Sequence, residues 1–441
     1  MQRLARWVVI ALINLGLLAV MLLVAEVAMQ KAFPCDMSGD SWHWSFVPGI
    51  GNVYVANDIV RQTKKFDNFC VEQRSNSLGF LDHEPPTWDE IKDKPRIAVV
   101  GDSLIEATQV KQSDKMQQWL AKDLAAAGID ASVVAWGVSG FGQVQELELL
   151  KRYGLSLHPN VVVLVIVGND IKNNSWLLQA VQDGVEPDTP YNVEIRPVPL
   201  TAPRAWETIA PLPIPQVKQL PGKQRPQPPA WAAWLNEHSA LYGYALHMAN
   251  YNYPRVYALL GGVVDEDRIQ NRVRYLSRDH DLAPLLAGWP TGEDWKYDAI
   301  SWTFEHLPHP RAFDLAVQAT EHSMDQWVDL ARREHFRIVA LMLQEFDDMP
   351  WQAAQWRRIL AERGIAAIWH GDFMRSHGYD PMAAHFARDP HWSPLGHRWA
   401  AEAVADFLKG HFADYFPKPD QVVEPEDGAS SSRAHSRLKA N

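Results

Sequence analysis

The 441-residue sequence is poor in cysteine, with only Cys35 and Cys70. Two cysteines exclude a structural zinc site made of four thiolates. Positive charge is also in deficit, because 42 Lys and Arg stand against 53 Asp and Glu and give a formal net charge of −11. Phosphate binding needs a basic face, so this balance argues against nucleic acid as the main partner.

Several motifs of large enzyme classes are missing as well. The sequence has no internal repeat, no Gly-rich loop that ends in Gly-Lys-Ser/Thr, and no His-Glu-x-x-His metal motif. What is present is an ordinary globular composition, with 47% hydrophobic and 22% charged residues. The length allows more than one domain, or one domain with a large insertion.

The N-terminus carries the one long hydrophobic run. Residues 7–25 are apolar except for Asn14 and Gly16, and these 19 residues approach the ~20 that a helix needs to cross a bilayer. Arg3 and Arg6 precede the run, which favours a cytoplasmic N-terminus and an exported remainder. The sequence therefore predicts a single-pass membrane protein whose main domain is periplasmic or otherwise extracytoplasmic.

A cleaved signal peptide is the alternative interpretation of this segment. Its cleavage site needs small residues, and the nearest candidate, Ala25-Glu26-Val27-Ala28, has Glu26 where a small residue is required. We therefore expect an uncleaved transmembrane anchor. In an exported domain a disulfide between Cys35 and Cys70 is plausible, and two free buried thiols are the alternative.

The remaining pattern divides the chain into segments. Strand and helix signals alternate from residue 95 to 173, stop, and return at residue 313. A long interruption of this kind is typical of an insertion with its own local structure. We expect an anchor (1–28), a connector (29–94), a first core segment (95–173), a Pro- and Trp-rich insertion (174–312), a second core segment (313–417) and a disordered polar tail (418–441).

Five short apolar runs in the two core segments predict the strands of one sheet. The run 161–167 is apolar throughout, which is typical of a strand buried on both faces. Ser393 and Pro394 form the cap and first position of a last helix. Alternation of strands and helices indicates an α/β fold with a parallel sheet covered on both faces. The expected strands are 97–100, 132–135, 161–167, 338–343 and 366–369.

Four polar segments follow predicted strands or precede the last helix. Loops after parallel strands emerge on one edge of the sheet, so these segments can converge there. They are Gly101-Asp102-Ser103-Leu104, the run 137–142, Gly168-Asn169-Asp170 and Asp389-Pro390-His391-Trp392-Ser393-Pro394.

The residue types in these segments are those that ester cleavage needs. Ser103 is a poor nucleophile until a base accepts its proton, and His391 can do so. A carboxylate must hold the imidazole in the right tautomer. Pro390 pushes Asp389 into an extended conformation, in which residues two apart lie on the same side, so Asp389 can approach His391. His397 is a competing base, but it lies inside the last predicted helix.

An acyl-transfer site also needs donors for the oxyanion of the tetrahedral intermediate. The candidates are the backbone N–H groups of Ser103 and Gly140 and the side-chain amide of Asn169. Together these residues predict an oxyanion hole beside the Ser103, His391 and Asp389 triad.

The combination resembles the SGNH/GDSL hydrolase family over residues 72–175 and 313–410. Gly101-Asp102-Ser103-Leu104 matches the first motif of that family literally. The resemblance implies a flavodoxin-like three-layer α/β/α core with five parallel strands and no metal or organic cofactor. It also implies Ser103 as nucleophile, Gly140 and Asn169 as oxyanion donors, and Asp389 and His391 as the remaining pair. The run 76–80 looks like the lead-in of membrane-anchored members.

One motif departs from the common pattern of the family. Most members space the last pair Asp-x-x-His, whereas Asp389, His391 and Trp392 form Asp-x-His-Trp. This spacing resembles the alginate acetyltransferase-like branch, in which the pair precedes the serine, while here it follows the serine.

The functional prediction is a membrane-anchored serine esterase that hydrolyses acyl esters through an acyl-serine intermediate. The expected substrate is an O-acetyl ester on a surface or cell-wall glycan. One alternative is a polysaccharide O-acyltransferase that uses the same triad. Another is a non-catalytic protein of envelope or exopolysaccharide assembly.

Overall fold

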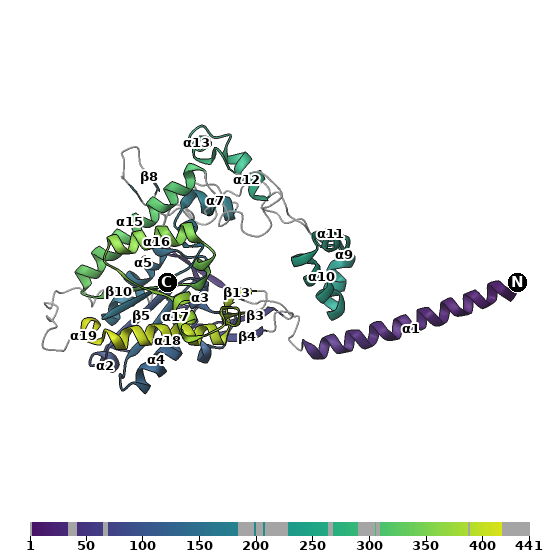
Figure 1. Ribbon diagram of the computed structural model, residues 1–441, viewed down its shortest axis with the longest axis horizontal. Helices are drawn as coiled ribbons and strands as arrows, with labels where there is room; N and C mark the ends of the chain where they lie inside the picture. The colour runs from purple at the N-terminus through teal and green to yellow at the C-terminus, as the bar shows by residue number, and fades with distance from the viewer. Residues whose placement is uncertain are drawn as a thin grey trace, which may run out of the picture.

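Most of the chain is described by the computed structural model (Figure 1). Cys35 and the predicted tail 418–441 lie outside the described residues, as does much of the insertion. The described residues are 2–33, 42–64, 69–183, 198–199, 206–207, 228–262, 268–289, 305, 309–386 and 389–416.

A five-stranded parallel sheet forms the centre of the molecule, in the order β11-β10-β7-β5-β6. Numbered along the chain, the order is 2-1-3-4-5, which is the flavodoxin-like arrangement. All five predicted strands are present, so the predicted α/β fold is confirmed. The strands are β5 (Arg96–Gly101), β6 (Ser132–Gly137), β7 (Val161–Ile166), β10 (Arg337–Met342) and β11 (Ala366–Trp369).

The hydrophobic core lies on both faces of this sheet. β7 is the central strand, and all six of its side chains are fully buried, as its unbroken apolar sequence predicts. Complete burial of one such aliphatic side chain stabilises the fold by roughly 1.5–3 kcal/mol. The best-buried strand of the sheet is therefore the neighbour of β5, the strand that leads into Ser103.

Helices cover the two faces of the sheet and make a three-layer sandwich (Figure 1). On one face, α4 (Met116–Ala126) packs against α18 (Pro394–Gly410). The other face carries α5 (Gln143–Leu149), α15 (Arg311–Glu334) and α16 (Pro350–Glu362). The last helix begins as predicted, because the Ser393 hydroxyl accepts a hydrogen bond from the backbone N–H of Gly396 at 3.3 Å.

The predicted connector 29–94 contains two antiparallel hairpins, which the sequence pattern did not indicate. They are β1 (Trp44–Val47) with β2 (Gly51–Tyr54), and β3 (Ile59–Lys64) with β4 (Phe69–Arg74). Along β4, buried and exposed side chains alternate, which is the pattern of a strand with one covered face. Cys70 in β4 is disulfide-bonded, and its predicted partner Cys35 lies outside the described residues.

The N-terminal helix α1 (Gln2–Ala32) projects away from the core (Figure 1). Its stretch Leu12–Ala32 is long and apolar enough to cross a membrane. The helix continues beyond the predicted anchor boundary at residue 28. Six described helices lie in the insertion: α7 (Trp176–Asp183), α9 (Ala230–His238), α10 (Ala240–Asn252), α11 (Pro254–Leu259), α12 (Arg268–Leu276) and α13 (Ala283–Leu286).

Candidate active site

Ser103 lies at the point where the strand order of the sheet reverses. It is the first residue of the short helix α3 (Ser103–Glu106), directly after β5. β5 lies between β6 and β7 in the sheet. The chain therefore goes from β5 to β6 on one side of β5 and then crosses to β7 on the other side. The crevice at such a switch point is where ligands bind in open parallel sheets.

A glycine at the end of β6 makes this arrangement possible. Gly137 pairs with Gly101 across the sheet. A Cβ added to Gly137 would lie 2.3 Å from the backbone nitrogen of Glu106 and 2.6 Å from the carbonyl carbon of Ile105. Any side chain at position 137 would therefore push α3 away from the sheet. Gly137 belongs to the polar segment 137–142, but its sequence context did not indicate this role; the available signal was the pair of glycines, Gly101 and Gly137, at the ends of two predicted strands.

Asp389 and His391 form a pair within one short strand, β13 (Asp389–Trp392). Asp389 Oδ1 accepts a hydrogen bond from the backbone N–H of His391 at 3.0 Å and contacts Nδ1 of the same residue's ring. The Asp389 side chain is 1% exposed, whereas the His391 side chain is 25% exposed. The carboxylate is thus shielded from water, while the ring can still reach a substrate.

The pair lies on the same side of the sheet as Ser103. Helix α3 contacts β13, and Asp102 interacts electrostatically with His391. Within the described part of the chain, the Ser103 hydroxyl donates a hydrogen bond to Asp102 Oδ2, at 3.4 Å, and makes none with the His391 ring. The structure therefore brings the predicted triad to one edge without the serine–histidine hydrogen bond.

The three candidate oxyanion donors follow three neighbouring strands. Neither the backbone N–H of Ser103 nor that of Gly140 has a hydrogen-bond partner among the described residues. Asn169 Nδ2 donates to Asp102 Oδ2 at 3.4 Å. Gly140 has φ +75°, a conformation that glycine adopts without strain. Two backbone donors and one amide are thus available at this edge.

The loop that carries Gly140 is fastened to α3. Glu106, which is buried, accepts a hydrogen bond from the Ser139 hydroxyl and a further one from Tyr54. Burial raises the pKa of the Glu106 carboxyl above its usual range. This contact couples the position of the Gly140 N–H to that of Ser103, a role for Ser139 and Glu106 that the sequence did not suggest.

Buried carboxyl groups lie beneath the site. Burial raises the pKa of Asp102, and burial together with neighbouring carboxylates raises the pKa values of Glu146 and Asp170 well above their usual range. Asp170 accepts hydrogen bonds from Gln143 Nε2 at 2.6 Å and from the backbone N–H of Val167 at 2.9 Å. Burial thus disfavours negative charge on Glu146 and Asp170, the two groups whose charge would repel that of Asp102.

A chain of side chains holds the backbone before His391. Gln344 Oε1 accepts from His370 Nδ1 at 2.9 Å, and Gln344 Nε2 contacts His385 Nε2. His385 Nδ1 lies 2.6 Å from the carbonyl oxygen of Pro390, which can only accept, so this nitrogen carries the proton. These contacts fix the backbone of Pro390, which directly precedes the candidate base His391.

The competing histidine is committed to packing. His397 is buried in α18, where its Nδ1 accepts a hydrogen bond from the backbone N–H of Met116 at 3.3 Å. Burial lowers the pKa of His397 to about 3. A ring held neutral and shielded in this way serves the packing of α18 on α4 rather than proton transfer.

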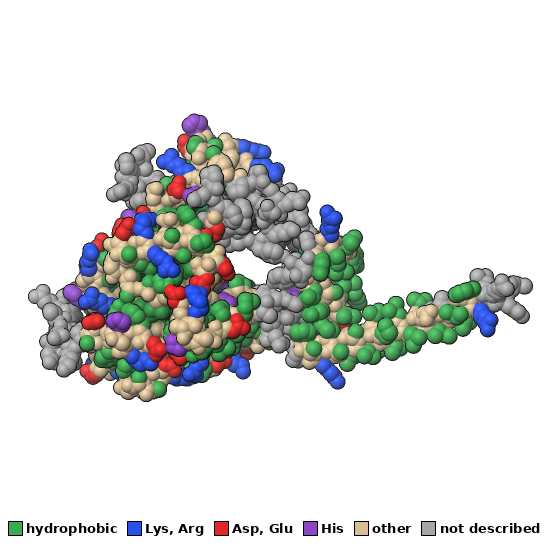
Figure 2. All heavy atoms as spheres, in the orientation of Figure 1, with side chains coloured by type: hydrophobic (Ala, Val, Ile, Leu, Met, Phe, Trp, Pro, Cys, Tyr) green, Lys and Arg blue, Asp and Glu red, His purple; other side chains and the backbone are tan. Residues whose placement is uncertain are grey.

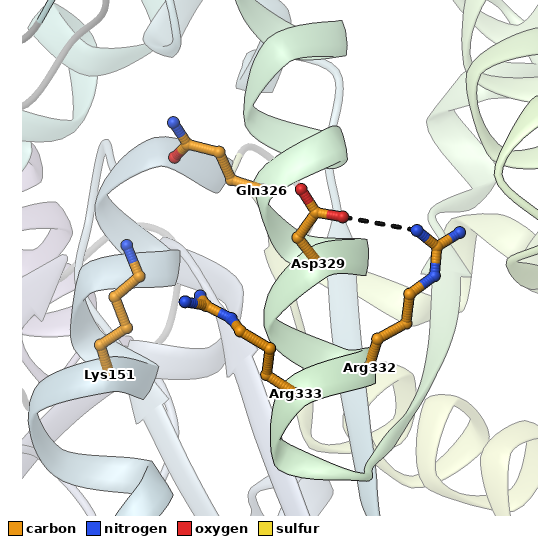
Figure 3. Close-up of a pocket in the computed structure, with 5 residues that line it drawn as sticks. All are labelled: Lys151, Gln326, Asp329, Arg332 and Arg333. Atoms are coloured by element: carbon orange, nitrogen blue, oxygen red, sulfur yellow. Dashed lines mark hydrogen bonds and ion pairs between the residues drawn. The ribbon is translucent and has the colours of Figure 1, made fainter.

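The surface hollow of Figure 3 lies away from this edge. It has a volume of about 480 Å³, and its lining comes from the π-helical turn Leu150–Gly154, which follows α5, and from the C-terminal part of α15. Arg332 and Asp329 form an ion pair there at 3.4 Å. Its lining residues are Lys151, Gln326, Asp329, Arg332 and Arg333, none of which belongs to the predicted site.

Comparisons with known proteins give remote structural likenesses only. No family model matches the chain, and no curated protein matches it. The crystal structure of TesA is 14% identical, with a TM-score of 0.33, and covers 71% of this chain and 98% of its own. The acetyl xylan esterase AlAXEase is 9% identical, with a TM-score of 0.32 and coverage of 71% and 99%.

A third solved structure is the psychrotrophic esterase EstA from Pseudoalteromonas sp. It is 9% identical, with a TM-score of 0.32, and covers 72% of this chain and 99% of its own. Because these sequence identities and TM-scores are low, the likeness to a known family depends on the strand order and the motifs of this chain alone. This chain has a flavodoxin-like sheet, with Ser103, Gly140 and Asn169 after three successive strands. Asp389 and His391 precede the last helix. This arrangement is similar to that of the SGNH/GDSL hydrolases.

Proposed function

We propose that the protein is a serine esterase that hydrolyses acyl esters through an acyl-Ser103 intermediate. The observation that carries the proposal is the Asp389–His391 pair on the same sheet edge as Ser103, with a shielded carboxylate and an accessible ring. A carboxylate on Nδ1 leaves Nε2 of the imidazole as the acceptor, which is the tautomer a general base needs.

Acylation begins when the Ser103 hydroxyl leaves the Asp102 carboxylate and turns to His391 Nε2. As Oγ attacks the ester carbonyl, its proton passes to Nε2, and the new imidazolium is stabilised by Asp389. The oxyanion accepts hydrogen bonds from the N–H groups of Ser103 and Gly140 and from the Asn169 amide. Collapse breaks the ester C–O bond, and the proton on Nε2 goes to the leaving alcohol.

Deacylation runs the same steps with water. Neutral His391 takes a proton from water as the water oxygen attacks the acyl-Ser103 carbonyl. Collapse of the second intermediate releases the carboxylic acid and returns the proton to Ser103 Oγ. Every proton transfer uses groups of this chain, so the mechanism needs no metal or organic cofactor.

We propose further that α1 anchors the enzyme in a membrane, with the N-terminus in the cytoplasm and the catalytic domain in the periplasm or outside the cell. The apolar stretch Leu12–Ala32 and the preceding Arg3 and Arg6 support this topology. An enzyme at this location meets surface and cell-wall glycans, and O-acetyl esters on such a glycan are the proposed substrate.

The test is ester hydrolysis by the purified full-length protein in detergent. Wild type should hydrolyse p-nitrophenyl acetate and react covalently with a fluorophosphonate probe, and Ser103→Ala should lose both. Ser113→Ala, which changes an exposed serine, is the matched control and should keep both. A folded wild-type protein that neither cleaves small esters nor reacts with the probe would refute the esterase proposal.

The proposal that an acetylated glycan is the substrate is tested by a separate measurement. Release of acetate from an acetylated polysaccharide is compared with release from p-nitrophenyl acetate at equal ester concentration. We expect kcat/KM to be higher for the polysaccharide. Activity on the small ester with none on any acetylated glycan would leave the esterase intact and remove the glycan as substrate.

A further inference from the structure

Helices α9, α10 and α11 form a small bundle beside the C-terminal end of α1 (Figure 1). The bundle (residues 230–259) belongs to the insertion. Between residues 228 and 262 the only acidic or basic side chains, apart from histidines, are Glu237 and Arg255. A chain in which 22% of residues are charged thus contains a nearly uncharged segment.

The bundle is attached to α1 through a carboxylate in the apolar helix. Glu26 accepts hydrogen bonds from the backbone N–H groups of Ala240 at 2.7 Å and Leu241 at 3.0 Å, and from the Ser239 hydroxyl at 2.8 Å. These groups belong to the first turn of α10, where unpaired N–H groups and the helix dipole favour an anion. Phe33 and Tyr244 stack nearby, with ring centroids 5.7 Å apart.

This contact explains an otherwise costly residue. An ionisable side chain in a membrane-spanning helix is expensive unless a specific partner satisfies it. Glu26 lies within the apolar stretch Leu12–Ala32, about two turns from its end. The first turn of α10 supplies three donors for it, so the bundle is held at a fixed level near the outer end of the span.

The outer surface of the bundle is apolar and aromatic. Figure 2 shows hydrophobic side chains that run from α1 onto the bundle without a charged belt between them. Leu259 is 82% exposed, which is unusual for leucine on a globular surface. Trp and Tyr are the residues enriched where protein meets the membrane–water interface. The exposed side chains are Trp231, Trp234, Tyr253, Val256 and Leu259.

We propose that the α9–α11 bundle is a second membrane contact, seated in the interfacial layer of the lipid bilayer next to the outer end of α1. The proposal rests on the membrane anchor of the proposed function. The apolar surface of the bundle is continuous with that of α1. Lipid is therefore the favoured partner of the bundle, because the lipid that surrounds Leu12–Ala32 would also contact the bundle. A second membrane contact fixes the orientation of the catalytic domain, which one helix alone cannot do.

The test measures the surroundings of single labelled positions in the full-length protein in phosphatidylcholine–phosphatidylglycerol vesicles. Cysteine variants at Leu259 and Trp234 carry a nitroxide, and its relaxation is measured with oxygen, which partitions into lipid, and with a water-soluble nickel chelate. Leu17→Cys on α1 is the lipid reference. Met382→Cys, on the core and 78% exposed, is the matched aqueous control.

We expect at least threefold lower nickel accessibility at Leu259 and Trp234 than at Met382, with oxygen accessibility closer to that of Leu17. Nickel accessibility equal to that of Met382, with a lipid signal at Leu17, would overturn the second contact and leave the anchor intact. Shielding from both reagents would also overturn it, because protein would then cover the bundle. An aqueous signal at Leu17 would refute the anchor itself, and the bundle proposal with it.

A second variant tests the attachment. Glu26→Ala removes the acceptor for the first turn of α10 and should raise nickel accessibility at Leu259 at least twofold, while Leu17 keeps its lipid signal. Glu237→Ala, which changes an exposed carboxylate within the bundle, should leave both positions unchanged. Equal effects of the two variants would contradict the assigned role of Glu26.

Discussion

Asp389 Oδ1 binds both the backbone N–H of His391 and Nδ1 of its ring. One oxygen atom therefore fixes the backbone and the imidazole of the same residue. The two side chains share one side of an extended strand because they are two positions apart. A single carboxylate thus sets both the tautomer and the direction of the candidate base.

Asp389→Asn should reduce kcat for ester hydrolysis by roughly 10³–10⁴-fold, because an amide in this place favours the wrong tautomer of His391. The measurement is p-nitrophenyl acetate hydrolysis, with thermal unfolding to check the fold. Asp130→Asn, at a carboxylate that is 80% exposed, is the control and should keep full activity. Equal activity of the two variants would exclude Asp389 as the orienting group.

Asn169→Ala should slow the reaction about a hundredfold, because loss of one oxyanion donor costs ~3 kcal/mol of barrier lowering. The reduction should appear in kcat more than in KM, since the donor acts on charge that develops in the transition state. A rise in KM with unchanged kcat would indicate that Asn169 binds the ground-state substrate instead.

Gly137→Ala should destabilise the fold by about 2–3 kcal/mol, because its Cβ would overlap the backbone of α3. Gly410→Ala is the matched control: its Cβ meets nothing within 4 Å, and alanine suits a helix end at least as well. Urea unfolding compares the two variants. Equal stability would mean that α3 does not press on β6 as closely as described.

Stability should fall below neutral pH in part because His397 is buried. Its ordinary pKa is 6.5, and burial lowers it to about 3. Between these pH values the His397 ring is protonated in the unfolded chain and neutral in the folded chain. The free energy of unfolding therefore decreases as pH falls from about 6.5 toward 3. At pH 5 this loss amounts to about 2 kcal/mol.

His397→Asn keeps an acceptor for the Met116 N–H and removes the titrating ring. The difference in unfolding free energy between pH 7 and pH 5 should shrink by about 2 kcal/mol in this variant. His280→Asn, at a fully exposed histidine, should leave that difference unchanged. An identical pH dependence in wild type and His397→Asn would contradict a neutral buried ring.

Much of the fold could be read from local patterns. The runs at 161–167 and 338–343 became β7 and β10 because a strand buried on both faces requires continuous apolar sequence. The hairpins before the core were missed, since β3 (IVRQTK) and β4 (FCVEQR) show no regular alternation of polar and apolar residues over their six positions each. Their stability depends on packing against distant elements, which no local pattern encodes.

The candidate site divides in the same way. The motifs supplied Ser103, Asn169 and the Asp389–His391 pair, because their spacing relative to strand ends is a local property. Gly137, the Ser139–Glu106 contact and the Gln344–His385 chain were not predicted, because each depends on contacts between segments far apart in sequence.

The sequence by itself determined the five strands of the core, the residues at their ends and the apolar N-terminal helix, because periodicity and turn chemistry are local. The tertiary structure decided that α3 lies against β6 through Gly137, that the Ser139 hydroxyl donates to Glu106, and that Glu26 caps α10. Those relations arise only when segments separated by tens to hundreds of residues pack together and satisfy each other's polar groups.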